Sequence, residues 1–241
     1  ISFIRQGFID ASWYEKSLEI LEKYPDGNEP IQMDRSLSSL ALAKKNKQPF
    51  IFRTNNELYI DRSNNISEEF DINLWIKGNG YEYIRIDEMP ASFMIVPVNF
   101  PGKPEVADPY NSLQYSIEQL KHWDMAPDNA KKLAKAGFEF SLTSDGLKNR
   151  QDFKNNLSRT IDRGLDESKA LAALTTIPAK KFGQAKRLGQ VETGFIANLV
   201  IVDGNYFESK SKINAVWIDG EKFEVSPDPI INAQGKWILI E

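Results

Sequence analysis

The stretch Gly137-Phe-Glu-Phe-Ser-Leu-Thr-Ser-Asp-Gly146 decides the fold that this sequence predicts. It is a short apolar run that ends on the carboxylate of Asp145, and a helical pattern at 128–136 leads into it through Gly137. Glycine at this point is typical of a left-handed helix end. Parallel strands gather functional side chains at their carboxyl ends, so Asp145 is the first candidate site residue. The alternative is that Asp145, lying before a glycine, only shapes a turn.

The same alternation of helix and strand extends upstream. Further short apolar strands are expected at 49–54, 73–77 and 92–97. Helical patterns are expected at 1–24, 34–45, 57–70, within 108–123, and at 128–136, 151–163 and 167–176, with Asp34 and Asp166 as N-caps. Short strands separated by helices predict an α/β fold with a parallel sheet and helices packed outside it.

The pattern changes after Gly183. Strand-like runs follow at 198–202, 215–218, 222–225 and 237–240, and helical periodicity disappears. Asp219-Gly220 between two apolar runs is a strong hairpin signal. We therefore expect an α/β domain over 1–185 and a small β unit over 186–241, with Pro227-Asp-Pro229 as a linker to a further region.

The composition is that of an ordinary soluble globular protein. The 241 residues include no cysteine and one histidine, and the formal net charge is −4. The lack of cysteine excludes disulfides and thiolate metal sites, and it suits either a cytoplasmic or an exported bacterial setting. The mixed charges give no nucleic-acid footprint, and no apolar run approaches the roughly 18 residues of a membrane helix.

Several motifs together resemble one known family. They are Asn129-Ala-Lys-Lys-Leu-Ala-Lys-Ala-Gly137 with Ser144-Asp145-Gly146, Ala170–Gly183 with Thr175-Thr-Ile-Pro-Ala179, Arg187-Leu-Gly-Gln-Val-Glu-Thr-Gly194, and Ala197-Asn-Leu-Val200. This order is similar to the carboxyl-terminal part of the amidohydrolase superfamily, in its imidazolonepropionase-like branch. The resemblance covers 127–223 and, more weakly, 37–101. The family usually has Asp where Asn198 stands.

The resemblance implies a fold and a chemistry. It implies the second half of a TIM-like (β/α) barrel, with part of the flanking β-sandwich. Because half a barrel exposes two sheet edges, the remaining half of the barrel or a homodimer partner is expected. It also implies hydrolysis of carbon–nitrogen bonds in non-peptide or dipeptide-like small molecules, with a divalent metal such as zinc. Asp145 would be the metal ligand and proton-transfer residue.

The family's histidine ligands have no counterpart in this chain. Its only histidine, His122, lies before the last barrel strand and matches no ligand position. The register places Arg53 and Lys77 where the family has histidines after the fifth and sixth strands. Protonated Arg and Lys offer no lone pair to a metal. The chain alone is therefore not expected to bind one, and Asp145 would be a ligand only if other ligands came from elsewhere in the protein.

Two arrangements of the two cations remain open. Arg53 and Lys77 either form ion pairs with Asp145 and contact substrate, or they point to solvent. Asn99, at another strand end, is a further candidate substrate-binding residue. His122 beside Trp123 is expected to be a packed or capping histidine. The loop carboxylates Glu82, Glu105 and Asp108 have no spacing that demands a site.

Two functions compete on these observations. One is an amidohydrolase-like enzyme of which this chain is a part. The other is a degenerate, metal-free domain of the same fold that binds a ligand or partner or serves as a scaffold. Metal content would discriminate between them.

Overall fold

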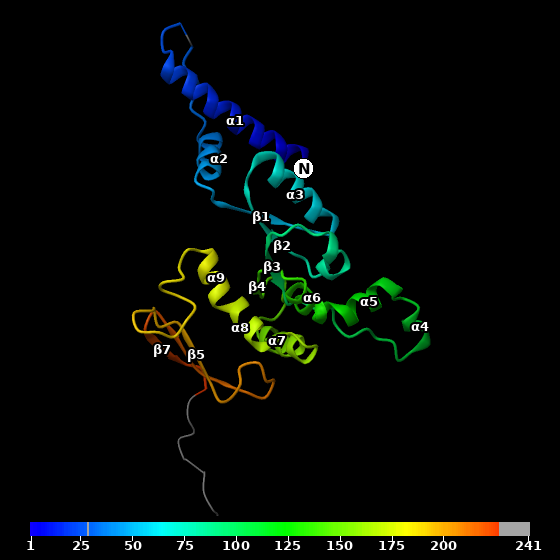
Figure 1. Ribbon diagram of the computed structural model, residues 1–241. Coiled ribbons are helices and arrows are strands. Elements are labelled where there is room, and N and C mark those ends of the chain that lie inside the picture. The colour runs from blue at the N-terminus through cyan, green and yellow to red at the C-terminus, as the bar shows by residue number, and fades with distance from the viewer. Residues whose placement is uncertain (28, 227–241) are drawn as a thin grey trace, which may run out of the picture. The chain divides into compact units, whose positions relative to one another are not determined.

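The computed structural model describes residues 1–27 and 29–226, which form two compact units. The first unit is Ile1–Ala173 and the second begins at Leu174 (Figure 1). This division lies ahead of the boundary at residue 185 that the sequence predicts. The predicted linker at 227–229 and strand at 237–240 lie outside the described residues.

A four-stranded parallel sheet is the centre of the first unit. Its strands, in the order β1-β2-β3-β4, are β1 (Pro49–Arg53), β2 (Asn73–Lys77), β3 (Phe93–Pro97) and β4 (Phe140–Thr143). Sequential order with parallel pairing confirms the predicted α/β class. Within the described residues the sheet stays open at β1 and β4 and does not close into a barrel.

Helices connect these strands and flank the sheet. They are α1 (Ser2–Lys23), α2 (Arg35–Lys45), α3 (Leu58–Phe70), α4 (Pro109–Ser112), α5 (Ile117–Met125), α6 (Asn129–Lys135), α7 (Asp152–Asp162) and α8 (Glu167–Leu174), with single 3₁₀ turns η1 (Glu82–Ile84), η2 (Ile86–Glu88) and η3 (Ala126–Asp128). The single helix expected within 108–123 is two, because Asp108 caps α4 and Ser116 begins α5 with a capping box.

Local sequence explains the helix ends. The Asp34 carboxylate accepts hydrogen bonds from the backbone N–H groups of Ser36 and Leu37, at 2.8 and 3.0 Å, as the N-cap of α2. Asp166 accepts one from the N–H of Lys169 ahead of α8. Gly137 adopts φ 84° after α6, the left-handed conformation predicted there.

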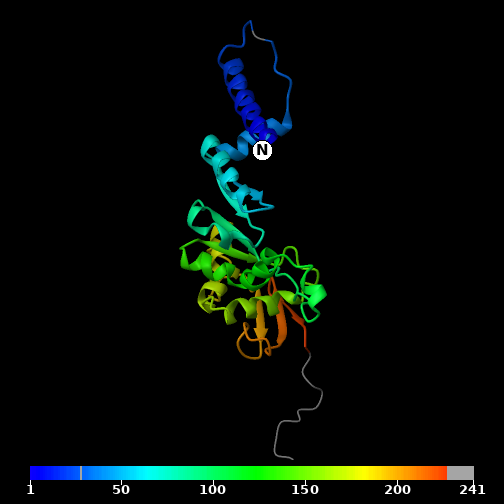
Figure 2. The same ribbon diagram turned by 90° about the vertical axis from the view of Figure 1, so that its right-hand side faces the viewer.

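An aromatic cluster joins α1 to the sheet. Phe8 stacks on Phe70 of α3, with ring centroids 5.1 Å apart, and meets Phe50 of β1 edge-on at 5.3 Å. Ile66 and Ile72 complete the buried cluster. α2 packs against α1, and the two blue helices are seen together in both views (Figures 1 and 2). The core therefore holds the amino end of α1 over β1.

The second unit contains α9 (Thr176–Lys181) and a three-stranded antiparallel sheet. Its strands are β5 (Leu199–Val202), β6 (Ile213–Ile218) and β7 (Glu221–Glu224). Asp219 and Gly220 have φ of 52° and 88° between paired Ile218 and Glu221, which is the predicted two-residue hairpin. These three strands form a single sheet, and the second layer of a sandwich is not seen among the described residues.

Candidate functional site

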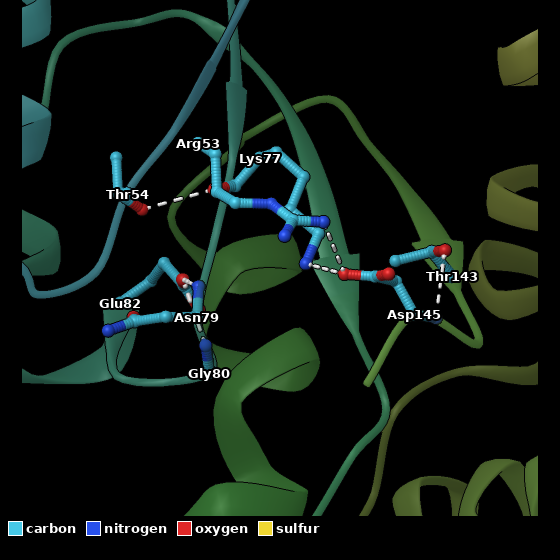
Figure 3. Close-up of polar contacts among 8 residues, drawn as sticks. All are labelled: Arg53, Thr54, Lys77, Asn79, Gly80, Glu82, Thr143 and Asp145. Carbon is cyan, nitrogen blue, oxygen red and sulfur yellow. Dashed lines mark hydrogen bonds and ion pairs between the residues drawn. The ribbon is translucent and has the colours of Figure 1, made fainter. Parts of the chain in front are cut away.

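Three charged side chains meet at the carboxyl ends of the parallel strands. Arg53 Nη2 lies 3.1 Å from Asp145 Oδ2, and Lys77 Nζ contacts the same oxygen (Figure 3). We call Arg53, Lys77 and Asp145 the strand-end triad. The ion pairs expected from the sequence are therefore confirmed, and the alternative in which both cations point to solvent is wrong.

The register of the sheet brings these residues together. Arg53 ends β1 and pairs with Lys77, which ends β2, so the two side chains start from neighbouring positions. The Thr54 hydroxyl and backbone N–H both donate to the Lys77 carbonyl, at 3.1 and 3.0 Å (Figure 3). Asp145 follows β4, and its backbone N–H donates to Thr143 Oγ1 at 3.2 Å. The triad is thus held by backbone on both sides.

The triad favours the ionised carboxylate. The Lys77 ammonium donates a hydrogen bond to the Asp145 carboxylate and attracts its negative charge. Both effects hold the pKa of that carboxyl below its ordinary value, and the positive charge of Arg53 adds to them. Lys77 is only 16% exposed, whereas Asp145 is 44% and Arg53 68% exposed. Solvent therefore screens the Arg53 contact more than the Lys77 contact.

These residues do not fit a divalent metal. Asp145 Oδ2 accepts hydrogen bonds from both Arg53 and Lys77, and neither of these cations offers a lone pair to a metal at neutral pH. Across residues 1–27 and 29–226, no group of three or more His, Asp or Glu side chains gathers in a way that could hold a metal ion. In the same part of the chain, no helix is long and apolar enough to cross a bilayer.

Glu82 has a structural role that the sequence alone does not predict. It is fully buried, and its carboxylate accepts from the backbone N–H groups of Asn79 and Gly80, at 2.6 and 3.1 Å (Figure 3). The carboxylate also accepts from Asn129 Nδ2 at 2.5 Å. A Cβ at Gly78 would lie 2.1 Å from Glu82 Oε1, so only glycine fits there. Glu82 therefore shapes the turn after β2.

His122 is a packed histidine, as predicted. Its ring stacks on Tyr81 at 3.6 Å between centroids, and its Nδ1 lies 3.2 Å from the Tyr83 hydroxyl. Burial lowers the pKa of this imidazole, which outweighs the opposing effect of Glu118. Among the described contacts, none joins His122 to the strand-end triad.

Asn99 lies against Gly146, the residue that follows Asp145. Its Nδ2 is 2.8 Å from the position that a Cβ on Gly146 would occupy, directly after Asp145. Both Asn99 and Gly146 line a cleft that also includes Lys103, Lys148 and Arg159. Sequence reasoning missed these three cations, because they come from separate loops and a helix. The sequence offered one signal, the position of Lys103 and Lys148 after predicted strands, and it offered none for Arg159 within a predicted helix.

The stability of the fold is expected to depend on pH through Asp145. Its folded pKa is lowered, so the triad adds stability above the ordinary carboxyl pKa of about 3.9, and that contribution is lost as the pH falls through the folded value. Urea unfolding should show that the free-energy difference between wild type and Asp145→Asn shrinks as the pH falls below about 4. Asp162→Asn, an exposed carboxylate on α7, is the control. A pH-independent difference would contradict this account.

Comparison with known families finds a match in the second half of the chain. Residues 127–223 match the model of the amidohydrolase family, the range over which the sequence motifs resemble that family. A curated protein, amidohydrolase tasK of Hapsidospora irregularis, is 32% identical over 107 residues, which are 44% of this chain and 11% of that protein.

Solved structures extend the likeness in fold to most of the chain. An amidohydrolase from Thermotoga maritima MSB8 matches with a TM-score of 0.70 at 23% identity, over 92% of this chain and 55% of its own. A prolidase solved with N-methylphosphonate-L-proline matches with a TM-score of 0.52 at 16% identity, over 81% of this chain and 51% of its own. The chain thus spans about half the length of these structures.

Proposed function

We propose that this chain is a metal-free module of a hydrolase that acts on carbon–nitrogen bonds of small non-peptide or dipeptide-like molecules. The hydrolase assignment rests on the amidohydrolase match over residues 127–223. The metal-free assignment rests on a single observation, the shared Asp145 oxygen that accepts from both Arg53 and Lys77. The module's role is then to bind or to support the fold.

The state of Asp145 supports this choice. A residue that shuttles a proton works best with a pKa near the operating pH. Lys77 and Arg53 move the pKa of Asp145 in the opposite direction, away from neutrality. The triad therefore resembles a structural ion pair more than a general acid or base, and it replaces ligand–metal attraction by direct charge pairing.

The second candidate is an active amidohydrolase site. The place of Asp145 after the last parallel strand favours it, because that edge of the sheet is where such folds carry their chemistry. In that case Asp145 would transfer the proton to the leaving nitrogen, and metal ligands would have to come from outside the described residues. Asn99, Arg53 and Lys77 would then contact the substrate.

Turnover of the full-length protein separates the two candidates. With Asp145→Asn, the metal-free proposal expects turnover of a carbon–nitrogen substrate to stay within about twofold of wild type. A proton-transfer residue would instead contribute about 10²–10⁴-fold. Asp162→Asn is the matched control for loss of one carboxylate. A loss of that size in Asp145→Asn alone would overturn the proposal in favour of the active site.

A further inference from the structure

We infer that the cleft beside β3 and β4 binds a small aromatic carboxylate. This cleft has a volume of about 520 Å³ and is lined by the loop after β3, the loop after β4, α5 and α7. A volume of this size suits a small organic molecule. Arg53, Lys77 and Asp145 are not among its lining residues, so the inference does not depend on hydrolysis.

Two glycine-containing loops shape the cleft. Gly146 has φ 85°, and a Cβ there would lie 2.8 Å from Asn99 Nδ2, so the β4 loop approaches Asn99 as closely as only glycine permits. Asn156 on α7 donates from Nδ2 to the Val98 carbonyl at 2.8 Å. This hydrogen bond fixes α7 against the end of β3. The Asn156 hydrogen bond and the turn at Gly146 therefore position these two walls.

The charges of the lining indicate an anionic ligand. Three cations, Lys103, Lys148 and Arg159, line the cleft with one carboxylate, Asp152. All four side chains are exposed, and within the part of the chain that the structure describes no ion pair is formed by any of them. The three cations contrast with Lys77 and Arg53, whose charges are balanced by Asp145. The excess of cations over carboxylate therefore favours an anion, and the aromatic part of the lining favours one that carries a ring over inorganic phosphate.

The aromatic residues of the lining indicate that the ligand carries a ring. The Arg159 guanidinium lies 5.4 Å from the centroid of the Phe100 ring, and Trp123 contributes a second aromatic surface. An arginine held over an aromatic ring presents its fork of N–H donors, which matches the two oxygens of a carboxylate. Asn99 and Asn155 add amide groups that can donate to the same anion. An aromatic carboxylate satisfies both halves of the lining.

Calorimetry on the whole protein tests the inference with three probes. Phenylacetate is expected to bind about tenfold more tightly than neutral phenylacetamide, the effect of one charge-assisted hydrogen bond. It should also bind more tightly than inorganic phosphate, which has no ring. Arg159→Gln should weaken phenylacetate binding about tenfold and leave phenylacetamide unchanged.

Arg35→Gln is the matched control, because Arg35 is exposed on α2 and lies outside the cleft lining. Circular dichroism verifies that both variants keep their helices. The inference is overturned if phenylacetate shows no binding at millimolar concentration or binds no better than phenylacetamide. It is also overturned if phosphate binds equally well, or if Arg159→Gln and Arg35→Gln behave alike.

Discussion

Replacing Glu82 with alanine is expected to lower the free energy of unfolding by about 3 kcal/mol or more. The buried carboxylate accepts from two backbone N–H groups and from Asn129. Each buried donor left without an acceptor costs about 1–3 kcal/mol. The change also removes the side chain that packs against Gly78 and so leaves a cavity. Urea denaturation at neutral pH measures the loss.

Two variants make this test specific to the hydrogen bonds. Glu82→Gln keeps the volume and one acceptor oxygen but places an amide donor in the network, so it should cost less than Glu82→Ala but more than zero. Glu105→Ala removes an exposed loop carboxylate and should change stability by less than about 0.5 kcal/mol. If Glu82→Ala matched Glu105→Ala, the carboxylate would have no structural role.

The second large effect concerns metal affinity. The double variant Arg53→His with Lys77→His is expected to raise zinc affinity by at least about 10–100-fold, the range that outer-shell partners alone contribute to metal sites. Two cations that now occupy the Asp145 oxygen would become two neutral imidazoles beside a free carboxylate. Zinc titration by calorimetry against wild type measures the gain.

The gain in zinc affinity should require that the two new histidines lie beside the Asp145 carboxylate. Adding Asp145→Asn to the double variant should remove most of it, because the carboxylate is then no longer a ligand. Arg35→His with Lys45→His adds the same number of histidines on the exposed surface of α2 and should gain little. Equal gains in the surface control would mean that the triad positions do not form a ligand set.

Sequence patterns predicted the sheet because they report local physics. The strand ending in Lys77 is apolar and buried along its centre, as expected for a strand inside a parallel sheet. Asp34 and Gly137 mark helix ends by their own chemistry. The triad followed from these elements, since parallel strands that end at one edge bring their last residues together.

The parts that sequence did not predict depend on contacts between distant segments. The network of Glu82 requires Asn129, which α6 brings from elsewhere in the chain. The cleft cations come from two loops and from α7. Neither hydrophobic periodicity nor residue spacing indicates contacts between residues that lie so far apart in the sequence. Closure of the barrel likewise depends on strands beyond the four found here, so the sheet confirms the α/β class and leaves the barrel as an expectation.

Zinc binding by the unmodified chain tests the central claim most directly. The chain, purified without chelators and dialysed against micromolar zinc, is expected to retain far less than one equivalent by elemental analysis, because Lys77 and Arg53 already occupy the Asp145 carboxylate. Stoichiometric zinc that is lost in Asp145→Asn would contradict the claim and identify the strand-end triad as a metal site.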